Sequence, residues 1–127
     1  MPNQVTNIGG VTSAITTTLA YSNGTVSIGT IPANSQIISV HIDVTTAFNA
    51  GTNNNITVGY AGSNAAYVTA TSGASAGRLN VSTTGVYSAW ANTGSSDLVA
   101  TVTYAQSGTA ASAGAAQVTI VYKSYAP

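Results

Sequence analysis

The sequence of 127 residues predicts an all-β fold, a two-sheet antiparallel sandwich, and three observations support this prediction. Thr, Val, Ile and Tyr, which favour strands, recur in short runs, whereas strong helix formers other than Ala are scarce. Gly and Asn interrupt these runs at short intervals. Apolar and polar residues alternate strictly from Ile38 to Thr45, which is typical of a half-buried strand. The strand count and spacing also fit a jelly roll, one form of such a sandwich.

The runs between turn signals give eight or nine strands, the weakest being 78–82 and 85–89. The predicted strands, in chain order, are residues 15–21, 25–31, 36–48, 55–60, 65–71, 78–82, 85–89, 98–104 and 117–122. In the third strand, the alternation assigns to the core Ile38, Val40, Ile42 and Val44.

Two connections carry their own predictions. Asn23-Gly24 separates two strand-like runs and is the strongest short signal for a hairpin. The Ala-, Ser- and Gly-rich segment 105–116 is expected to be a loop that joins two paired strands.

Residues 1–10, which end in Gly9-Gly10, are expected to form a flexible N-terminal arm, and residues 11–127 a single β-sandwich domain.

Charged residues are unusually scarce, at 3% of the chain against about 25% in a typical domain. The two cations, Arg78 and Lys123, are too few to neutralise a run of phosphates, so neither a nucleic acid nor an anionic membrane is expected as a partner. Cysteine is absent, which excludes disulfides and thiolate chemistry. The sequence shows no apolar stretch of transmembrane length and no secretory signal pattern, so we expect a product made in the cytoplasm.

The titratable residues do not form a recognisable catalytic motif. His41 and Asp43 lie two residues apart on one predicted strand, so they should share a face, but no Ser is marked as the third member of a triad. One His and two Asp match no zinc or calcium spacing. We therefore expect no enzyme, no cofactor, and no catalytic, cofactor-binding or metal-binding residues, with His41 and Asp43 facing solvent or an interface.

Aromatic residues are the better candidates for binding. Tyr and Trp can form a platform for sugars, and they are also common anchors of protein interfaces. We expect partner-binding roles for Trp90, Tyr122 and Tyr125, the last two of which flank Lys123. A net charge of zero leaves no repulsion between copies, which favours association of the chain with itself.

Two segments carry a resemblance to a known group of proteins. One runs over residues 31–60 and contains Asp43-Val-Thr, Phe48, Gly51-Thr and Ile56-Thr-Val-Gly. The other runs from the Gly/Ala/Thr loop at 109–114 into Gln117-Val-Thr-Ile-Val-Tyr. This order resembles small virion structural proteins of tailed bacteriophages, many of which are head decoration or cement proteins.

The resemblance implies a β-sandwich or jelly roll that sits on capsomer junctions as a dimer or trimer and carries no catalytic residues. The expected function is that of a capsid decoration or cement protein, located on the capsid surface of the virion and made in the host cytoplasm. Its expected partners are the major capsid protein lattice, which it stabilises, and further copies of itself. Two alternatives stay open, namely another virion component such as a fibre, spike or tail protein, and a carbohydrate-binding β-sandwich module.

Overall fold

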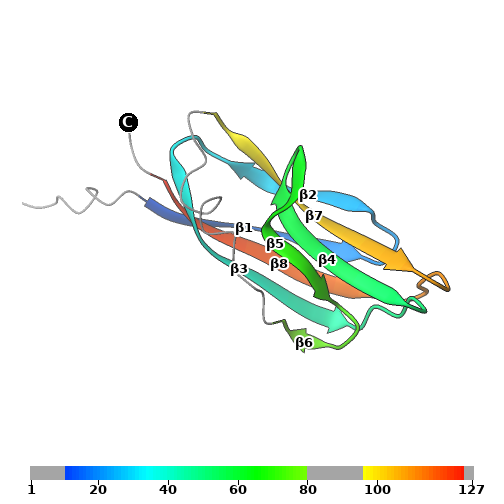
Figure 1. The fold of residues 1–127 in the computed structure, drawn as a ribbon. Coiled ribbons are helices and arrows are strands. Elements are labelled where there is room, and N and C mark those ends of the chain that lie inside the picture. Colours follow the sequence, from blue (N-terminus) through cyan, green and yellow to red (C-terminus); the bar gives the residue numbers. More distant parts are fainter. Residues whose placement is uncertain (1–10, 80–95, 125–127) are drawn as a thin grey trace, which may run out of the picture.

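Two four-stranded antiparallel sheets pack face to face in the computed structural model, which describes residues 11–79 and 96–124 (Figure 1). The order of strands in the first sheet is β1 (Val11–Ala20), β8 (Ala115–Ser124), β3 (Ser35–Thr46) and β6 (Gly77–Arg78). The order in the second sheet is β2 (Thr25–Ile31), β7 (Leu98–Ser107), β4 (Asn53–Tyr60) and β5 (Ser63–Ser72). The predicted all-β antiparallel sandwich is confirmed.

Some sequence predictions fall on residues that the structure does not describe. The proposed N-terminal arm, residues 1–10, lies outside the described ranges, and so do the predicted strand at 85–89 and most of the one at 78–82. The described part of that region contains β6, which pairs with β3 through Asp43 and Val44. The division into an arm and one domain therefore stays a prediction.

Most connections cross from one sheet to the other, and this contradicts two predictions. β1 and β2, which flank Asn23-Gly24, lie in different sheets, so that turn is a corner between sheets and not a hairpin. β7 and β8, which flank the loop at 108–114, do not pair either. In both cases the two strands that flank the connection form hydrogen bonds with other strands of their own sheets. The Asn23 side chain still organises its turn, since Ala20 N donates to Asn23 Oδ1 over 2.9 Å.

A β-bulge changes the predicted core face of β3. The prediction is confirmed for three residues that are at most 3% exposed, Val40, Ile42 and Val44, but it is wrong for Ile38, which is 45% exposed. Ile37 occupies the core position in its place. The pairing of β3 with β8 shifts register between Ile37 and Ser39, and one extra residue reverses the side on which the preceding side chain lies.

The core consists mainly of aliphatic side chains from the inner faces of both sheets. The side chains with no exposed surface include Leu19, Ile31, Ile42, Ile56, Val58, Val68, Val102, Val118 and Ile120. Each such side chain contributes about 1.5–3 kcal/mol through its removal from water. This burial holds the sandwich together in a chain without disulfides.

The connections β1–β2, β3–β4, β5–β6 and β7–β8 meet at one end of the sandwich around Phe48. The Phe48 ring is buried, and its centroid lies 4.6 Å from that of Tyr104. Gly73 and Gly114 approach the ring so closely that a Cβ at either position would collide with it. The Tyr104 hydroxyl donates to Asn54 Oδ1 over 2.6 Å, and the Asn54 amide also bonds the backbone of the β3–β4 loop. These contacts fix the loops at this end.

The bulge in β3 predicts unequal effects for two neighbouring substitutions. Ile37→Ala should lower the free energy of unfolding by about 2–5 kcal/mol, because it removes methylene groups from a packed core. Ile38→Ala should lower it by less than about 1 kcal/mol, because that side chain already contacts water. Urea-induced unfolding of both variants measures the difference. Equal losses, or a larger loss for Ile38→Ala, would contradict the register shift between Ile37 and Ser39.

Buried tyrosines predict a loss of stability in alkaline solution. Burial raises the pKa of Tyr67 to about 12, with a smaller contribution from neighbouring Tyr60, and burial also raises the pKa of Tyr104. An unfolded tyrosine ionises near pH 10, so the stabilisation is complete below about pH 10 and is lost as the pH rises toward about 12. For Tyr67 the full loss amounts to roughly 3 kcal/mol.

Unfolding in urea at about pH 9 and at about pH 12 measures this loss. The Tyr67→Phe variant should lose clearly less stability over that range than the unmodified chain, because Phe has no proton to release. Tyr21→Phe is the control, since Tyr21 is exposed on the surface. A Tyr67→Phe variant whose stability falls as steeply as that of Tyr21→Phe would refute this assignment.

Candidate functional site

The outer face of the first sheet carries most of the ionisable side chains. The whole chain has two basic residues, two acidic residues and one histidine. Four of these five lie on this face, namely His41 and Asp43 on β3, Arg78 on β6 and Lys123 on β8. The alternation that buries Val40, Ile42 and Val44 turns the residues between them outward. Low total charge is therefore combined with its concentration on one surface.

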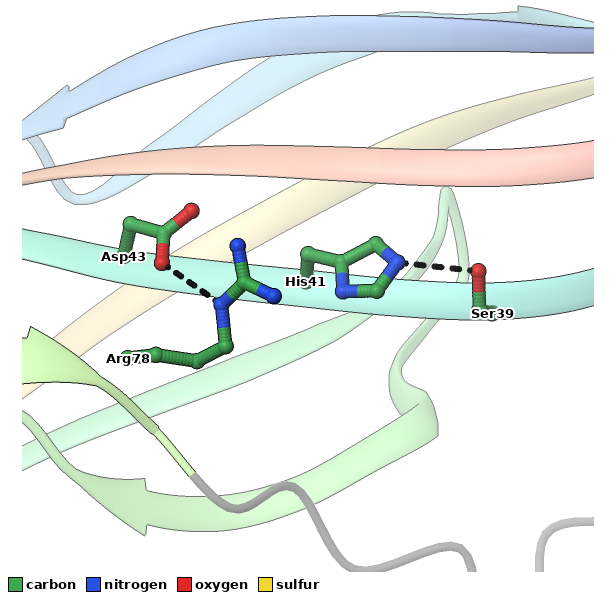
Figure 2. Close-up of polar contacts among 4 residues, drawn as sticks. All are labelled: Ser39, His41, Asp43 and Arg78. Atoms are coloured by element: carbon green, nitrogen blue, oxygen red, sulfur yellow. Dashed lines mark hydrogen bonds and ion pairs between the residues drawn. The ribbon is translucent and has the colours of Figure 1, made fainter.

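Two polar contacts organise the β3 part of this face (Figure 2). Ser39 Oγ and His41 Nε2 share a hydrogen bond of 3.1 Å. Arg78 Nε donates to Asp43 Oδ1 over 3.0 Å, and the two side chains are 67% and 42% exposed. A pair with this exposure stabilises the fold by at most about 1 kcal/mol. The pair is therefore better suited to a contact surface than to holding the sheet together.

The Ser39–His41 contact does not extend to a catalytic triad. A triad requires a carboxylate on the second ring nitrogen of the histidine, but the Asp43 carboxylate bonds Arg78. Within residues 11–79 and 96–124, no three His, Cys, Asp or Glu side chains are close enough together to hold a metal ion. The predicted placement of His41 and Asp43 on one face is confirmed. The arrangement offers hydrogen bonds and charge to a partner more readily than it supports bond-making chemistry.

Small polar groups and one large apolar side chain complete the face. Thr119 Oγ1 donates to Thr16 Oγ1 over 3.0 Å, and Thr16 Oγ1 donates in turn to the Val118 carbonyl. Ile38, which the bulge turns outward, is one of the most exposed large hydrophobic residues of the described ranges. The other aliphatic residue of this kind is Val99, whose place in β7 puts it on the outer face of the second sheet.

The three residues predicted to bind a partner differ in what the structure says of them. Trp90 and Tyr125 lie outside the described residues. Tyr122 packs in the core with 9% of its surface exposed. The sequence does contain a signal for this position, because Val118, Ile120 and Tyr122 alternate along β8 and share its inner face. A contact role for these three residues stays a prediction.

The tyrosines of the described ranges mostly pack inward. Tyr67 and Tyr104 are at most 5% exposed, and the half-buried ring of Tyr60 lies 5.7 Å from that of Tyr67. Tyr21 is the most exposed tyrosine of those ranges, with 37% of its surface accessible. Sugar binding requires an accessible ring face, so these residues give little support to the carbohydrate-binding alternative. The part of the chain that the structure describes also contains no helix capable of spanning a membrane.

Comparisons with known proteins find likeness in structure only. No family model matches the sequence, and no curated protein does. A chain in the capsid asymmetric unit of cyanophage Pam1 is 17% identical with a TM-score of 0.61, and the match covers 98% of this chain and 91% of that one.

Two further capsid structures match in the same way. For the acid-stable capsid of Helicobacter pylori bacteriophage KHP30, the identity is 11%, the TM-score is 0.65, and the coverage is 94% of this chain and 92% of that one. For the capsid of Ralstonia phage GP4, the identity is 13%, the TM-score is 0.65, and the coverage is 100% and 93%. At these identities the matches show that this chain has the fold of those chains.

Proposed function

We propose that this chain is a structural component of a bacteriophage virion, of the capsid decoration or cement type. The observation that carries the proposal is the match, over nearly all of both chains, to chains in three phage capsid structures. Because coverage is above nine tenths on both sides, those chains are about as long as this one. Eight strands in two four-stranded antiparallel sheets are compatible with a jelly roll, an architecture common in viral capsid domains, and this supports the same role.

In this role the molecule acts mechanically. A sandwich with a closely packed core can bridge neighbouring subunits of the major capsid protein lattice on the outside of the head, and so resist its expansion. Each contact can be weak, because the many copies on one shell act together. A chain with zero net charge adds no repulsion when copies are crowded.

We assign attachment to the outer face of the first sheet. This face combines the exposed Ile38 with the charged groups of Asp43, Arg78 and Lys123, so it offers both apolar surface and directional contacts. The first residue of β1, Val11, pairs with the last residue of β8, Ser124. Val11 and Ser124 therefore lie at the same end of this sheet. We include residues 1–10, Trp90 and Tyr125, which lie outside the described residues, among the proposed contacts.

The first test asks whether the protein belongs to the capsid. Mass spectrometry of purified particles from the phage that encodes it should detect the chain in many copies per particle. An electron-microscopy reconstruction should place these copies on the outside of the head. Absence from the particles would refute a virion role. A position on a fibre, spike or tail would refute the decoration role and favour another virion component.

The second test asks which face attaches. Particles prepared without the protein are mixed with the purified chain, and the bound fraction is measured after sedimentation. Ile38→Asp should weaken binding at least about tenfold, because it introduces a charge that must lose its water in the interface. Val99→Asp, on the outer face of the second sheet and similarly exposed, should bind like the unmodified chain. Equal binding by both variants, or weaker binding by Val99→Asp, would refute the assigned face.

A further inference from the structure

β1 differs from the other edge strands of the two sheets. In the described ranges the edges are β1 and β6 in the first sheet, and β2 and β5 in the second. β6 has only two residues, one of which is Arg78. A register shift at Ser27/Gly29 interrupts β2, and two such shifts interrupt β5. Short length, charge and bulges are the means by which proteins prevent an edge from pairing with another chain.

None of these features is present in β1. It pairs with β8 over ten consecutive residues, from Val11 opposite Ser124 to Ala20 opposite Ala115, without a register shift. Its sequence, VTSAITTTLA, contains no charged residue and no proline. Six of these ten residues are β-branched, which favours extended structure. The strand is thus a long, regular edge whose outward N–H and C=O groups can accept another strand.

We propose that β1 pairs antiparallel with β1 of a second copy of this chain about a two-fold axis. In every register of such a pairing an uncharged residue faces an uncharged residue, so no like charges oppose each other. The exposed residues of β1 are Thr12, Ala14, Thr16 and Thr18, and threonines paired across strands stabilise a sheet. Ile15 and Val26, which are only partly buried against the core, lie on the two neighbouring edge strands and lose further exposed surface in the dimer.

The pairing joins the first sheet of one copy to the first sheet of the other, which gives one continuous sheet of eight strands. Both copies then present their outer faces, with His41, Asp43 and Arg78, on the same side of the joined sheet. If this face attaches to a shell, the dimer attaches through two sites. The pairing itself does not depend on the proposed virion role, because it follows from the edge strand alone.

The test measures the mass of the full chain in solution by sedimentation or light scattering. The unmodified chain should have twice the monomer mass of 12.5 kDa. The double variant Ala14→Lys/Thr18→Lys should have the monomer mass, because lysines from the two copies lie near one another in the joined sheet. Its circular dichroism spectrum should remain close to that of the unmodified chain, since both positions are exposed, and its unfolding midpoint should fall only by the stabilisation that the dimer contact supplies.

The matched control is Ala65→Lys/Thr69→Lys on β5. It changes the same residue types at the same spacing, at exposed positions of an edge strand in the second sheet, and adds the same charge. This control should remain dimeric. A monomeric or trimeric unmodified chain, a dimer that survives Ala14→Lys/Thr18→Lys, or dissociation of the control as well would each overturn the proposal.

Discussion

The structure depends on the burial of alternate aliphatic side chains between the two sheets. The chain has no cysteine, and the one ion pair of the described ranges, Asp43–Arg78, is largely exposed. A surface pair contributes at most about 1 kcal/mol, whereas each fully buried aliphatic side chain contributes about 1.5–3 kcal/mol. The same alternation decides what the surface presents, because the backbone that buries Val40 and Ile42 must turn His41 and Asp43 outward.

Periodicity in the sequence predicts the strands, but it cannot predict how they pair. The alternation along residues 38–45 identifies β3, since it is a local property of the chain. The bulge that exposes Ile38 arises in pairing with β8, about eighty residues further along, and no local pattern encodes it. The same holds for Asn23-Gly24, whose local turn is formed while the strands on either side join different sheets.

For the candidate site too, the sequence predicts the local part and not the contacts between distant strands. Spacing along one strand places His41 and Asp43 on one face, and it could also have indicated Ser39, two residues before His41. The contact of Arg78 with Asp43 joins residues 35 apart and depends on how β6 adds to the sheet. Composition adds a different kind of information. Because the chain has only five charged or histidine residues, the presence of four of them on one face is a distinctive feature of the folded molecule.

A β-sandwich without net charge lacks the repulsion that keeps copies apart. Its edge strands can limit self-association instead. Without repulsion between copies, several open edges would permit growth in more than one direction. In the described ranges, bulges or short length block three of the edges, and only β1 is without such a feature. Pairing of β1 with its own copy about a two-fold axis uses both open edges at once, so the assembly closes and cannot extend into a fibre. The outer face of the first sheet remains accessible in that dimer, which allows self-association and attachment to a larger shell to occur together.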